Sequence, residues 1–315
     1  MSRSGYRDLF FERAVVAEQM SKVGDRLLVR APAKINLSLL IAGKRDDGFH
    51  EIDTVVSKID LCDELLFETG SKEGIELVCR GKYEVAADED NLVCKAYRML
   101  SKSVGGVGNV KITLTKNIPI GSGLGGGSSD AAAALLGLNE FAGLGVNIDL
   151  LVDIAGLLGS DIPFFLGGPL AICRGRGEKI CEIKEKFSFR AILVLPNVSV
   201  STKMVYKNYV YEESEYQALK KQIEGLIEKN KFDLLTGVCA NMLERSCFQL
   251  HEELAGLRDR IRSLGGVFDS VCLSGSGSTM YCICADAGET DVEYYQSILK
   301  DKVGCDSMIV SNNRW

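Results

Sequence analysis

Histidine is scarce in this chain, since His50 and His251 are the only two among 315 residues. A zinc site built from histidines is therefore not expected, because such a site needs several nitrogen or sulfur ligands. No apolar run reaches the roughly 18 residues of a membrane-spanning helix, so we expect no membrane segment. Lysine and arginine form no basic stripe and the net charge is −6, which argues against a nucleic acid or an anionic membrane as partner.

Paired cysteines and a P-loop are also missing. The 11 cysteines are scattered, odd in number and without Cys-x-x-Cys spacing, a usage typical of free thiols in a reducing cytoplasm. Cys282 and Cys284 alternate on a predicted strand, so they share one face and need no disulfide. No Gly-Lys-Ser or Gly-Lys-Thr occurs, so the lysine of a P-loop is not available to hold phosphates.

Glycine, in contrast, is concentrated in one stretch. Residues 118–138 read IPIGSGLGGGSSDAAAALLGL, with five glycines between 121 and 127. Glycine lets the backbone turn sharply and approach a ligand, the Ser-Ser-Asp at 128–130 offers helix N-cap residues, and four alanines favour a helix. A glycine loop at a helix N-terminus presents free N–H groups to an anion. We therefore predict a phosphate-binding loop rather than a plain flexible loop before a buried helix.

The same stretch contains Gly-x-Gly-x-x-Gly at Gly121, Gly123 and Gly126, the spacing of dinucleotide-binding proteins. A Rossmann unit also needs a strand after the helix and an acidic residue near the end of that strand. Here a glycine-rich turn and a second helical pattern follow instead. A nicotinamide-dependent oxidoreductase is therefore disfavoured, and we expect backbone amides and serine hydroxyls to hold the phosphates.

The length predicts about two domains, and the content of 46% hydrophobic and 25% charged residues is ordinary for a globular protein. We place an N-terminal extension at 1–27, a first domain at 28–185 and a second domain at 186–315. The four acidic residues of the extension disfavour a transit peptide. The extension is expected to be an additional helix or a poorly ordered arm.

Hydrophobic patterns predict antiparallel strands mixed with helices. Alternating apolar residues and turn signals predict strands at 28–43, 52–68, 75–79, 110–120 and 190–196, and a strand-turn-strand unit at 271–285. Helical spacing predicts helices at 92–100 and 148–159, each behind an asparagine cap, and at 220–229, 234–244 and 253–264. Regular βαβ alternation is absent, so the predicted fold class is α+β.

Four further stretches could carry chemistry. Lys34 lies in PAKIN, Phe49 and His50 lie in a GFH turn, Asp161 lies in GSDIPFF, and LSGSGS at 273–278 is a weaker signal. Each has a structural interpretation when taken alone: an edge-strand lysine, a core aromatic beside a turn histidine, and a capping carboxylate. The functional interpretation therefore depends on the stretches occurring together.

Together they resemble one family. APAKINLSLLIAGKRDDGFHEIDTVVSKIDLCDEL, IPIGSGLGGGSSDAAAALLGLN, LLGSDIPFFLGGPLAICRGRGE and LSGSGST are similar to the 4-diphosphocytidyl-2-C-methyl-D-erythritol kinase family of the GHMP superfamily of galactokinase, homoserine, mevalonate and phosphomevalonate kinases. The resemblance covers about residues 30–278. It implies a two-domain fold with the active site in the interdomain cleft. It also implies ATP-dependent phosphorylation of the 2-hydroxyl of 4-diphosphocytidyl-2-C-methyl-D-erythritol, which we call the cytidyl substrate. This reaction belongs to the methylerythritol phosphate route to isoprenoids.

The resemblance further implies roles for single residues. Lys34 and Asp161 correspond to catalytic positions. The substrate-binding residues that it implies are Asn36, Phe49, His50, Thr202 and Tyr206, and the family usually has tyrosine where Phe49 stands. The ATP-binding residues that it implies are Pro119, Gly121, Ser122, Gly123, Leu124, Gly125, Gly126, Gly127, Ser128 and Ser129. Mg²⁺ is expected with the triphosphate, and Ser128 or Ser129 is our candidate for its protein ligand.

The expected chemistry is consistent with these residue types. A carboxylate can accept the hydroxyl proton, and an ammonium can stabilise the alkoxide or the γ-phosphate. Two alternatives stay open, namely a superfamily kinase for homoserine or mevalonate and a ligand-binding sensor without catalysis. The GFH turn and a second aromatic, Tyr206, favour a nucleotide-like substrate, and we predict that Phe49 and Tyr206 stack on either side of its cytosine ring while His50 contacts the polar edge of the ring. The presence of both Lys34 and Asp161 argues against a sensor. The oligomeric state is not predicted.

Overall fold

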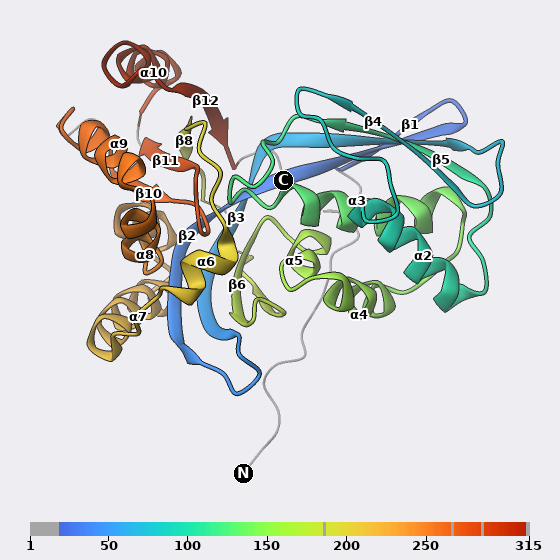
Figure 1. Ribbon diagram of the computed structural model, residues 1–315, viewed down its shortest axis with the longest axis horizontal. Coiled ribbons are helices and arrows are strands. Elements are labelled where there is room, and N and C mark those ends of the chain that lie inside the picture. The colour runs from blue at the N-terminus through green and yellow to red at the C-terminus, as the bar shows by residue number, and fades with distance from the viewer. Residues whose placement is uncertain (1–18, 185–186, 266–267, 285–286, 313–315) are drawn as a thin grey trace.

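The computed structural model describes residues 19–184, 187–265, 268–284 and 287–312. In Figure 1 the long strands β2 (Arg26–Lys44) and β3 (His50–Thr69) run between two groups of helices. The described strands form two sheets, and most strand pairs are antiparallel. The predicted α+β class is confirmed.

The larger sheet has eight strands and carries one group of helices on one side, at the right of Figure 1. Beside β2 and β3 it contains β1 (Met20–Val23), β4 (Ile75–Gly81), β5 (Val110–Lys116), β6 (Leu170–Gly175), β7 (Lys179–Glu182) and β9 (Ala240–Asn241). The helices of this group are α2 (Leu92–Val104), α3 (Gly126–Phe141), α4 (Ile148–Leu158) and α5 (Ile162–Leu166).

The smaller sheet lies at the left of Figure 1 and has four strands in the order β10-β11-β8-β12. These strands are β8 (Arg190–Leu195), β10 (Ser270–Leu273), β11 (Met280–Cys284) and β12 (Asp306–Ser311). The accompanying helices are α6 (Thr202–Lys207), α7 (Glu213–Glu228), the 3₁₀ helix η1 (Phe232–Val238), α8 (Glu244–Leu250), α9 (Glu252–Arg262) and α10 (Glu289–Val303).

Two hydrophobic cores share the strands β2 and β3. Val29 of β2 and Phe67 of β3 pack into a core with α2 and α3. Further along the same strands, Ile35 and Ile59 pack into a second core with residues of the smaller sheet. Because β2 and β3 contribute to both cores, they tie the two halves of the chain together.

The predicted domain limits stay a prediction, because the boundary at 185/186 falls outside the described residues. The second core nevertheless draws residues from both sides of this boundary. The N-terminal extension is described only from residue 19 onwards, and its segment β1 pairs antiparallel with β2, with Met20 opposite Val29. The helix or poorly ordered arm predicted for residues 1–27 is wrong for its described part, because residues 20–23 form the strand β1 and β2 begins at Arg26. Residues 1–18 lie outside the described residues.

Several predicted helix ends are confirmed. The side chain of Asn91 caps α2 by accepting a hydrogen bond from the Val93 amide, and the side chain of Asn147 caps α4 by accepting one from the Leu150 amide. Gly159 ends α4. These caps satisfy backbone N–H groups that have no partner inside the helix.

The predicted start of the alanine-rich helix is wrong. Gly125 precedes the first helical residue with a left-handed φ of 73°, and α3 begins at Gly126 without a side-chain cap. The Ser-Ser-Asp at 128–130 therefore belongs to the helix. Its Asp130 side chain accepts a hydrogen bond from Lys116 instead of capping the backbone.

The predicted helix at 234–244 is also wrong. The segment consists of η1, the short strand β9 and the first residue of α8. Asn241 explains the interruption, because its amide nitrogen donates to the carbonyls of Leu273 and Gly275 at 2.8 and 2.7 Å. These bonds attach the segment to the end of β10 and the turn that follows it. Residues 240 and 241 then pair with β2 as a short strand instead of continuing a helix. Among the residues that the structure describes, no helix is long and apolar enough to span a membrane.

Two glycines in helices of the same half predict opposite effects of an added methyl group. Gly137→Ala should destabilise the protein, because the new Cβ would lie 2.2 Å from Cζ of the fully buried Phe67, and overpacking costs about 1–3 kcal/mol. Gly156→Ala should stabilise it by up to about 1 kcal/mol through helix propensity, since a Cβ there meets nothing within 4 Å. Urea unfolding measures both, and equal changes in stability would contradict this packing.

Candidate active site

Two cavities adjoin at the glycine loop, and both include Gly123 and Gly125 in their walls. The first has a volume of about 230 Å³ and is lined by Lys34, Asn36, Leu39, Ile52, Thr54, Val56, Gly123, Gly125, Asp161, Phe164, Phe165, Cys173, Gly177, Thr202, Tyr206, Gly275 and Ser276. The second has a volume of about 360 Å³ and is lined by Val85, Asn91, Leu92, Leu114, Lys116, Pro119, Ile120, Gly121, Ser122, Gly123, Gly125, Gly126, Gly127, Ser128 and Asp130.

The structure thus brings most of the predicted site residues to these two walls. Lys34, Asn36, Asp161, Thr202 and Tyr206 line the first cavity. The glycine-loop residues line the second, except for Leu124 and Ser129, which are buried. Phe49 and His50 do not line either cavity.

Three hydrogen bonds from both halves of the chain fix the glycine loop. The carbonyl of Leu124 accepts from the backbone N–H of Lys34 at 2.9 Å. On the other side, the Ser274 hydroxyl donates to the carbonyl of Gly123 at 3.0 Å, and the Thr279 amide donates to the carbonyl of Ser122 at 3.2 Å. The carbonyls are therefore occupied, while the first N–H groups of α3 have no partner within the helix. Together with the helix dipole, these N–H groups are suited to bind an anion.

A buried ion cluster beside the loop was not found by sequence reasoning. The ammonium of Lys116 donates to Asp130 at 2.6 Å and also to Asp63, and it lines the second cavity. Burial raises the pKa of Asp130. The Lys116 ammonium opposes this rise, and the neighbouring carboxylate of Asp63 adds to it. The only signal in the sequence was a lysine five residues before the first glycine of the loop, and nothing there indicated its two carboxylate partners.

Lys34 and Asp161 face the same cavity. The Lys34 side chain is 5% exposed and donates from Nζ to Oδ1 of Asn36 at 2.5 Å. Burial lowers the pKa of Lys34, and the negative charge of Asp161 opposes this shift. The two side chains make no direct ion pair in the described part of the chain. Both charged groups are therefore available to a molecule bound in this cavity.

A chain of hydrogen bonds holds Asn36 in one orientation. The Thr54 hydroxyl donates to the carbonyl of Ser38 at 2.5 Å, so it accepts from Nδ2 of Asn36, which lies 2.9 Å away. Oδ1 of Asn36 is then left for Lys34, which can only donate. The Tyr281 hydroxyl donates to the backbone carbonyl of Asn36 at 2.6 Å, so the smaller sheet also supports this strand.

The aromatic side chains near the first cavity are grouped around His50. The ring of His50 lies 5.3 Å from that of Tyr206 and 5.9 Å from that of Tyr209. Phe49 is 51% exposed, and its ring is stacked against the Arg176 guanidinium, 4.0 Å from the ring centroid. The aromatic neighbour of Tyr206 in this structure is therefore His50, whereas a Phe49–Tyr206 pair around cytosine stays a prediction.

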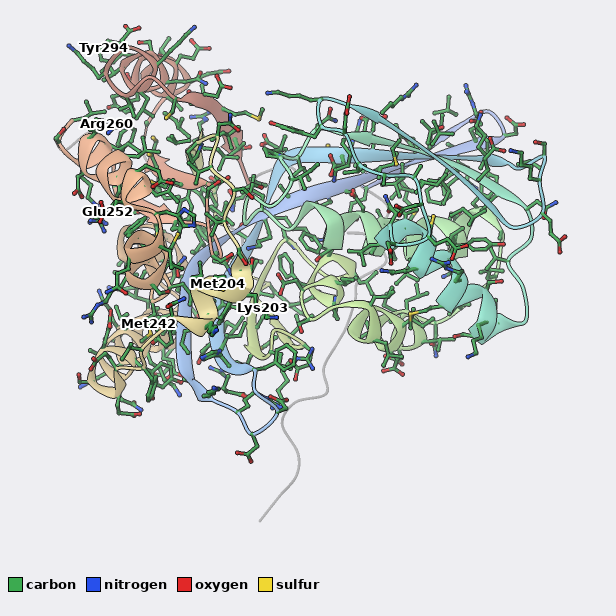
Figure 2. All side chains as sticks on the ribbon, viewed as in Figure 1. Lys203, Met204, Met242, Glu252, Arg260 and Tyr294 are labelled. Atoms are coloured by element: carbon green, nitrogen blue, oxygen red, sulfur yellow. The ribbon has the colours of Figure 1, made fainter. Side chains whose placement is uncertain are left out.

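Arg176 and Thr202 connect the walls of this region. Nη2 of Arg176 donates to the Ser160 hydroxyl at 3.2 Å, next to Asp161, so one side chain joins the GFH turn to the turn before α5. The hydroxyls of Thr202 and Ser276 are 2.8 Å apart. Thr202 begins α6, which Lys203 and Met204 mark in Figure 2. Arg176 lies within the sequence GRGE, but its contacts could not be read from that motif.

The residues present are compatible with a magnesium ion bound to a nucleotide. Oγ of Ser129 and Oδ1 of Asp130 are buried without a hydrogen-bond partner, and Ser128 lines the second cavity. Among the described residues no group of three or more His, Cys, Asp or Glu side chains could form a metal site. Oxygen ligands in small number suit Mg²⁺, which keeps water and phosphate oxygens in its coordination shell.

Comparisons with known proteins give the class first. The N-terminal domain of GHMP kinases matches residues 91–168, which include the glycine loop and α5. Solved structures share the fold: a homoserine kinase from Cytophaga hutchinsonii has a TM-score of 0.72 and 19% identity over 92% of this chain and 95% of its own. A mevalonate kinase from L. major has a TM-score of 0.69 and 16% identity over 93% and 96% of the two chains. The chain is a small-molecule kinase of the GHMP type.

Closer relatives give the family. The 4-diphosphocytidyl-2-C-methyl-D-erythritol kinase of Bacillus cereus (strain B4264) is 39% identical over 256 residues, which cover 81% of this chain and 87% of the relative. A crystal structure of 4-(cytidine 5'-diphospho)-2C-methyl-D-erythritol kinase has a TM-score of 0.70 and 30% identity over 90% of this chain and 98% of its own. The chain therefore belongs to the 4-diphosphocytidyl-2-C-methyl-D-erythritol kinase family.

Gly127 offers a clean test of the phosphate-binding loop. Its φ is not left-handed and an added Cβ would meet only Cδ1 of Leu92, at 3.6 Å. Gly127→Val should therefore raise the KM for ATP tenfold or more by blocking the approach of phosphate, with an unchanged melting temperature. Gly125→Val is less informative, because its Cβ would lie 2.8 Å from Cζ of Phe165. Unchanged ATP kinetics in Gly127→Val would remove this loop from the nucleotide site.

Proposed function

We propose that the protein transfers the γ-phosphoryl group of ATP to the 2-hydroxyl of 4-diphosphocytidyl-2-C-methyl-D-erythritol. Asp161 acts as general base and Lys34 as its charge partner. The main support is that Lys34 and Asp161 line one cavity, and that this cavity shares Gly123 and Gly125 with the glycine-loop cavity. Phosphoryl transfer needs this adjacency, because the attacking oxygen and the γ-phosphate must meet in line.

In the proposed reaction the substrate hydroxyl gives its proton to the carboxylate of Asp161 while its oxygen forms the new bond to phosphorus. The bond between the γ-phosphorus and the bridging oxygen breaks, and ADP leaves. Lys34 stabilises the negative charge on the attacking oxygen and the γ-phosphate. Because Lys34 is buried, its charge acts in a medium of low dielectric, where it is worth more than in water. Mg²⁺ bound near Ser128 and Ser129 would neutralise triphosphate charge.

The proposed specificity rests on the aromatic side chains beside the first cavity. Phe49 and Tyr206 would stack on cytosine, with His50 reading its polar edge. Burial and the nearby Lys44 lower the pKa of His50, so the ring is neutral at pH 7 and has one donor and one acceptor. Asn36 and Thr202 would contact the remainder of the substrate. The exposed face of Phe49 and the ring cluster of His50, Tyr206 and Tyr209 support this assignment.

The same aromatic cluster argues against homoserine or mevalonate as the substrate. Neither molecule carries a ring that could stack on an aromatic side chain, whereas stacking contributes about 1–3 kcal/mol for a nucleobase. The superfamily fold alone does not choose between these substrates, because homoserine and mevalonate kinases share it. The three compounds should be tested in parallel as substrates. Turnover of only the cytidyl substrate would support the proposal, and turnover of homoserine or mevalonate would contradict it.

Asp161→Asn should lower kcat by about 10² or more, which is the range for general base catalysis. The amide keeps the size of the side chain but cannot accept the proton, so binding of both substrates should persist. Lys34→Ala should also lose turnover. The assay follows ADP release with ATP, Mg²⁺ and the cytidyl substrate. Asp153→Asn, an exposed position on α4, is the control. A near-normal kcat in Asp161→Asn would assign the base elsewhere.

Phe49→Ala should raise the KM for the cytidyl substrate by about tenfold or more and leave the KM for ATP unchanged. Its melting temperature should hold, because the side chain is half exposed. His50→Ala should narrow the preference for the cytidine substrate over its uridine analogue. The competing interpretation makes Phe49 a hydrophobic plug against Arg176. A lower melting temperature with an unchanged KM for the cytidyl substrate would support the plug.

A further inference from the structure

A second buried lysine lies directly across the strand pair from Lys34. Lys58 of β3 is the register partner of Lys34 of β2, and its side chain is completely buried. Its ammonium donates to the backbone carbonyls of Phe165 and Gly167 at 3.1 and 2.7 Å. It also lies 5.9 Å from the ring centroid of Phe164. Burying an ammonium group that is not hydrogen-bonded to a carboxylate lowers the stability of the fold. The role of Lys58 is therefore indicated by the two carbonyls to which it donates.

Lys58 holds the end of α5, which is only five residues long. The last carbonyls of any helix have no partner within the helix, and a helix this short is not stable by itself. At its other end, Asp161 occupies the N-cap position but makes no side-chain capping bond. The lysine therefore supplies the hydrogen bonds that this helix lacks at its C-terminal end.

The residues just after the helix are held from a second side. The backbone N–H of Gly168 donates to Oε1 of Glu182 at 2.5 Å, and the backbone N–H of Lys58 donates to the carbonyl of Pro169 at 2.8 Å. Burial lowers the pKa of Lys58 to about 7, with the charge of Glu182 acting against this shift. A neutral amine still has two N–H donors for its two carbonyls, so these bonds persist in either protonation state.

The position of α5 matters for both cavities. Asp161 precedes the helix, and Phe164 and Phe165 form part of the wall of the first cavity. Phe165 also abuts the glycine loop, because a Cβ on Gly125 would lie 2.8 Å from Cζ of Phe165. A shift of α5 would therefore change the distance between the Asp161 carboxylate and the loop that is proposed to hold the phosphates.

We propose that Lys58 is a positioning residue for phosphoryl transfer, which fixes α5 through the carbonyls of Phe165 and Gly167 and thereby sets Asp161 against the glycine loop. This proposal rests on the proposed role of Asp161 as general base. Lys58 does not touch the substrate cavity itself, so it acts through the helix and through its aromatic wall.

Lys58→Met keeps most of the side-chain stem but removes the amine. We expect kcat to fall by about tenfold to a hundredfold, the effect of misplacing a catalytic group by about 1 Å. The loss in kcat should exceed any rise in the KM values for ATP and for the cytidyl substrate, because transfer depends more steeply than binding on the position of a catalytic group. In an Asp161→Asn background the same substitution should have no further effect on kcat, since its route of action is already lost.

The matched control is Asn139→Ala. Asn139 likewise makes two hydrogen bonds to the backbone, to the N–H and the carbonyl of Val146, both at 2.9 Å, but it lies at the far end of α3. It should lower the melting temperature and leave kcat intact. A Lys58→Met enzyme with a lower melting temperature and a kcat within twofold of wild type would overturn the proposal and leave Lys58 a purely structural residue. An undiminished effect in the Asp161→Asn background would also overturn it.

Two further measurements keep the test decisive. If Lys58→Met does not fold, Lys58→Gln retains two N–H donors on a shorter stem and should give an intermediate kcat. A normal kcat in that variant together with faster hydrogen exchange of residues 162–168 would overturn the proposal, because α5 would then be loosened without an effect on turnover. If the wild-type protein does not phosphorylate the cytidyl substrate, the proposed function fails. Hydrogen exchange of residues 162–168 still tests whether the bonds from Lys58 hold α5 in place. Faster exchange in Lys58→Met supports this hold on α5, and unchanged exchange refutes it.

Discussion

The long antiparallel pairing of β2 with β3 is the constraint on which the rest of the structure depends. It runs from Leu27 opposite Phe67 to Lys44 opposite His50, with irregularities after Pro32, Asn36 and Ile41. Because side chains alternate between the two faces of a strand, a slip of one residue would turn every side chain to the other face. The pairing thereby sets Lys34 opposite Lys58, and it carries both hydrophobic cores. One register thus determines which residues of β2 and β3 line the first cavity and how the two halves of the chain are connected.

Three buried lysines cluster around the two cavities, and the chain stabilises each of them differently. Lys116 has two carboxylates, Asp63 and Asp130. Lys58 has two backbone carbonyls. Lys34 has a single amide oxygen, on Asn36. A buried charge without partners is strongly unfavourable, and Lys34 has the fewest hydrogen-bond partners of the three, with the charge of Asp161 acting on it through the cavity. This difference supports the proposed role of Lys34 as the cation that meets the charge of a substrate.

The sequence predicted what is encoded locally. The strands around PAKIN, the asparagine caps of α2 and α4 and the glycine loop all depend on neighbouring residues, and all are present. The failures involve distant partners. The segment 234–244 has a helical pattern, but Asn241 bonds to residues more than 30 positions away. Lys58 and Lys116 read as ordinary strand residues, because their partners at 165–167, 63 and 130 adjoin them only in the folded chain.

The glycines of LSGSGS are also explained by a distant contact. They allow the turn at 273–278 to pack closely against the glycine loop. A Cβ on Gly123 would lie 2.1 Å from the carbonyl oxygen of Ser274, and one on Gly275 would lie 3.3 Å from Nζ of Lys34. Both glycines also have a left-handed φ, which a side chain rarely adopts. The first turn belongs to the larger-sheet half and the second to the smaller-sheet half. Because neither turn has room for a side chain at the contact, the position of the glycine loop depends on the turn from the smaller-sheet half, and Lys34 lies against the same turn.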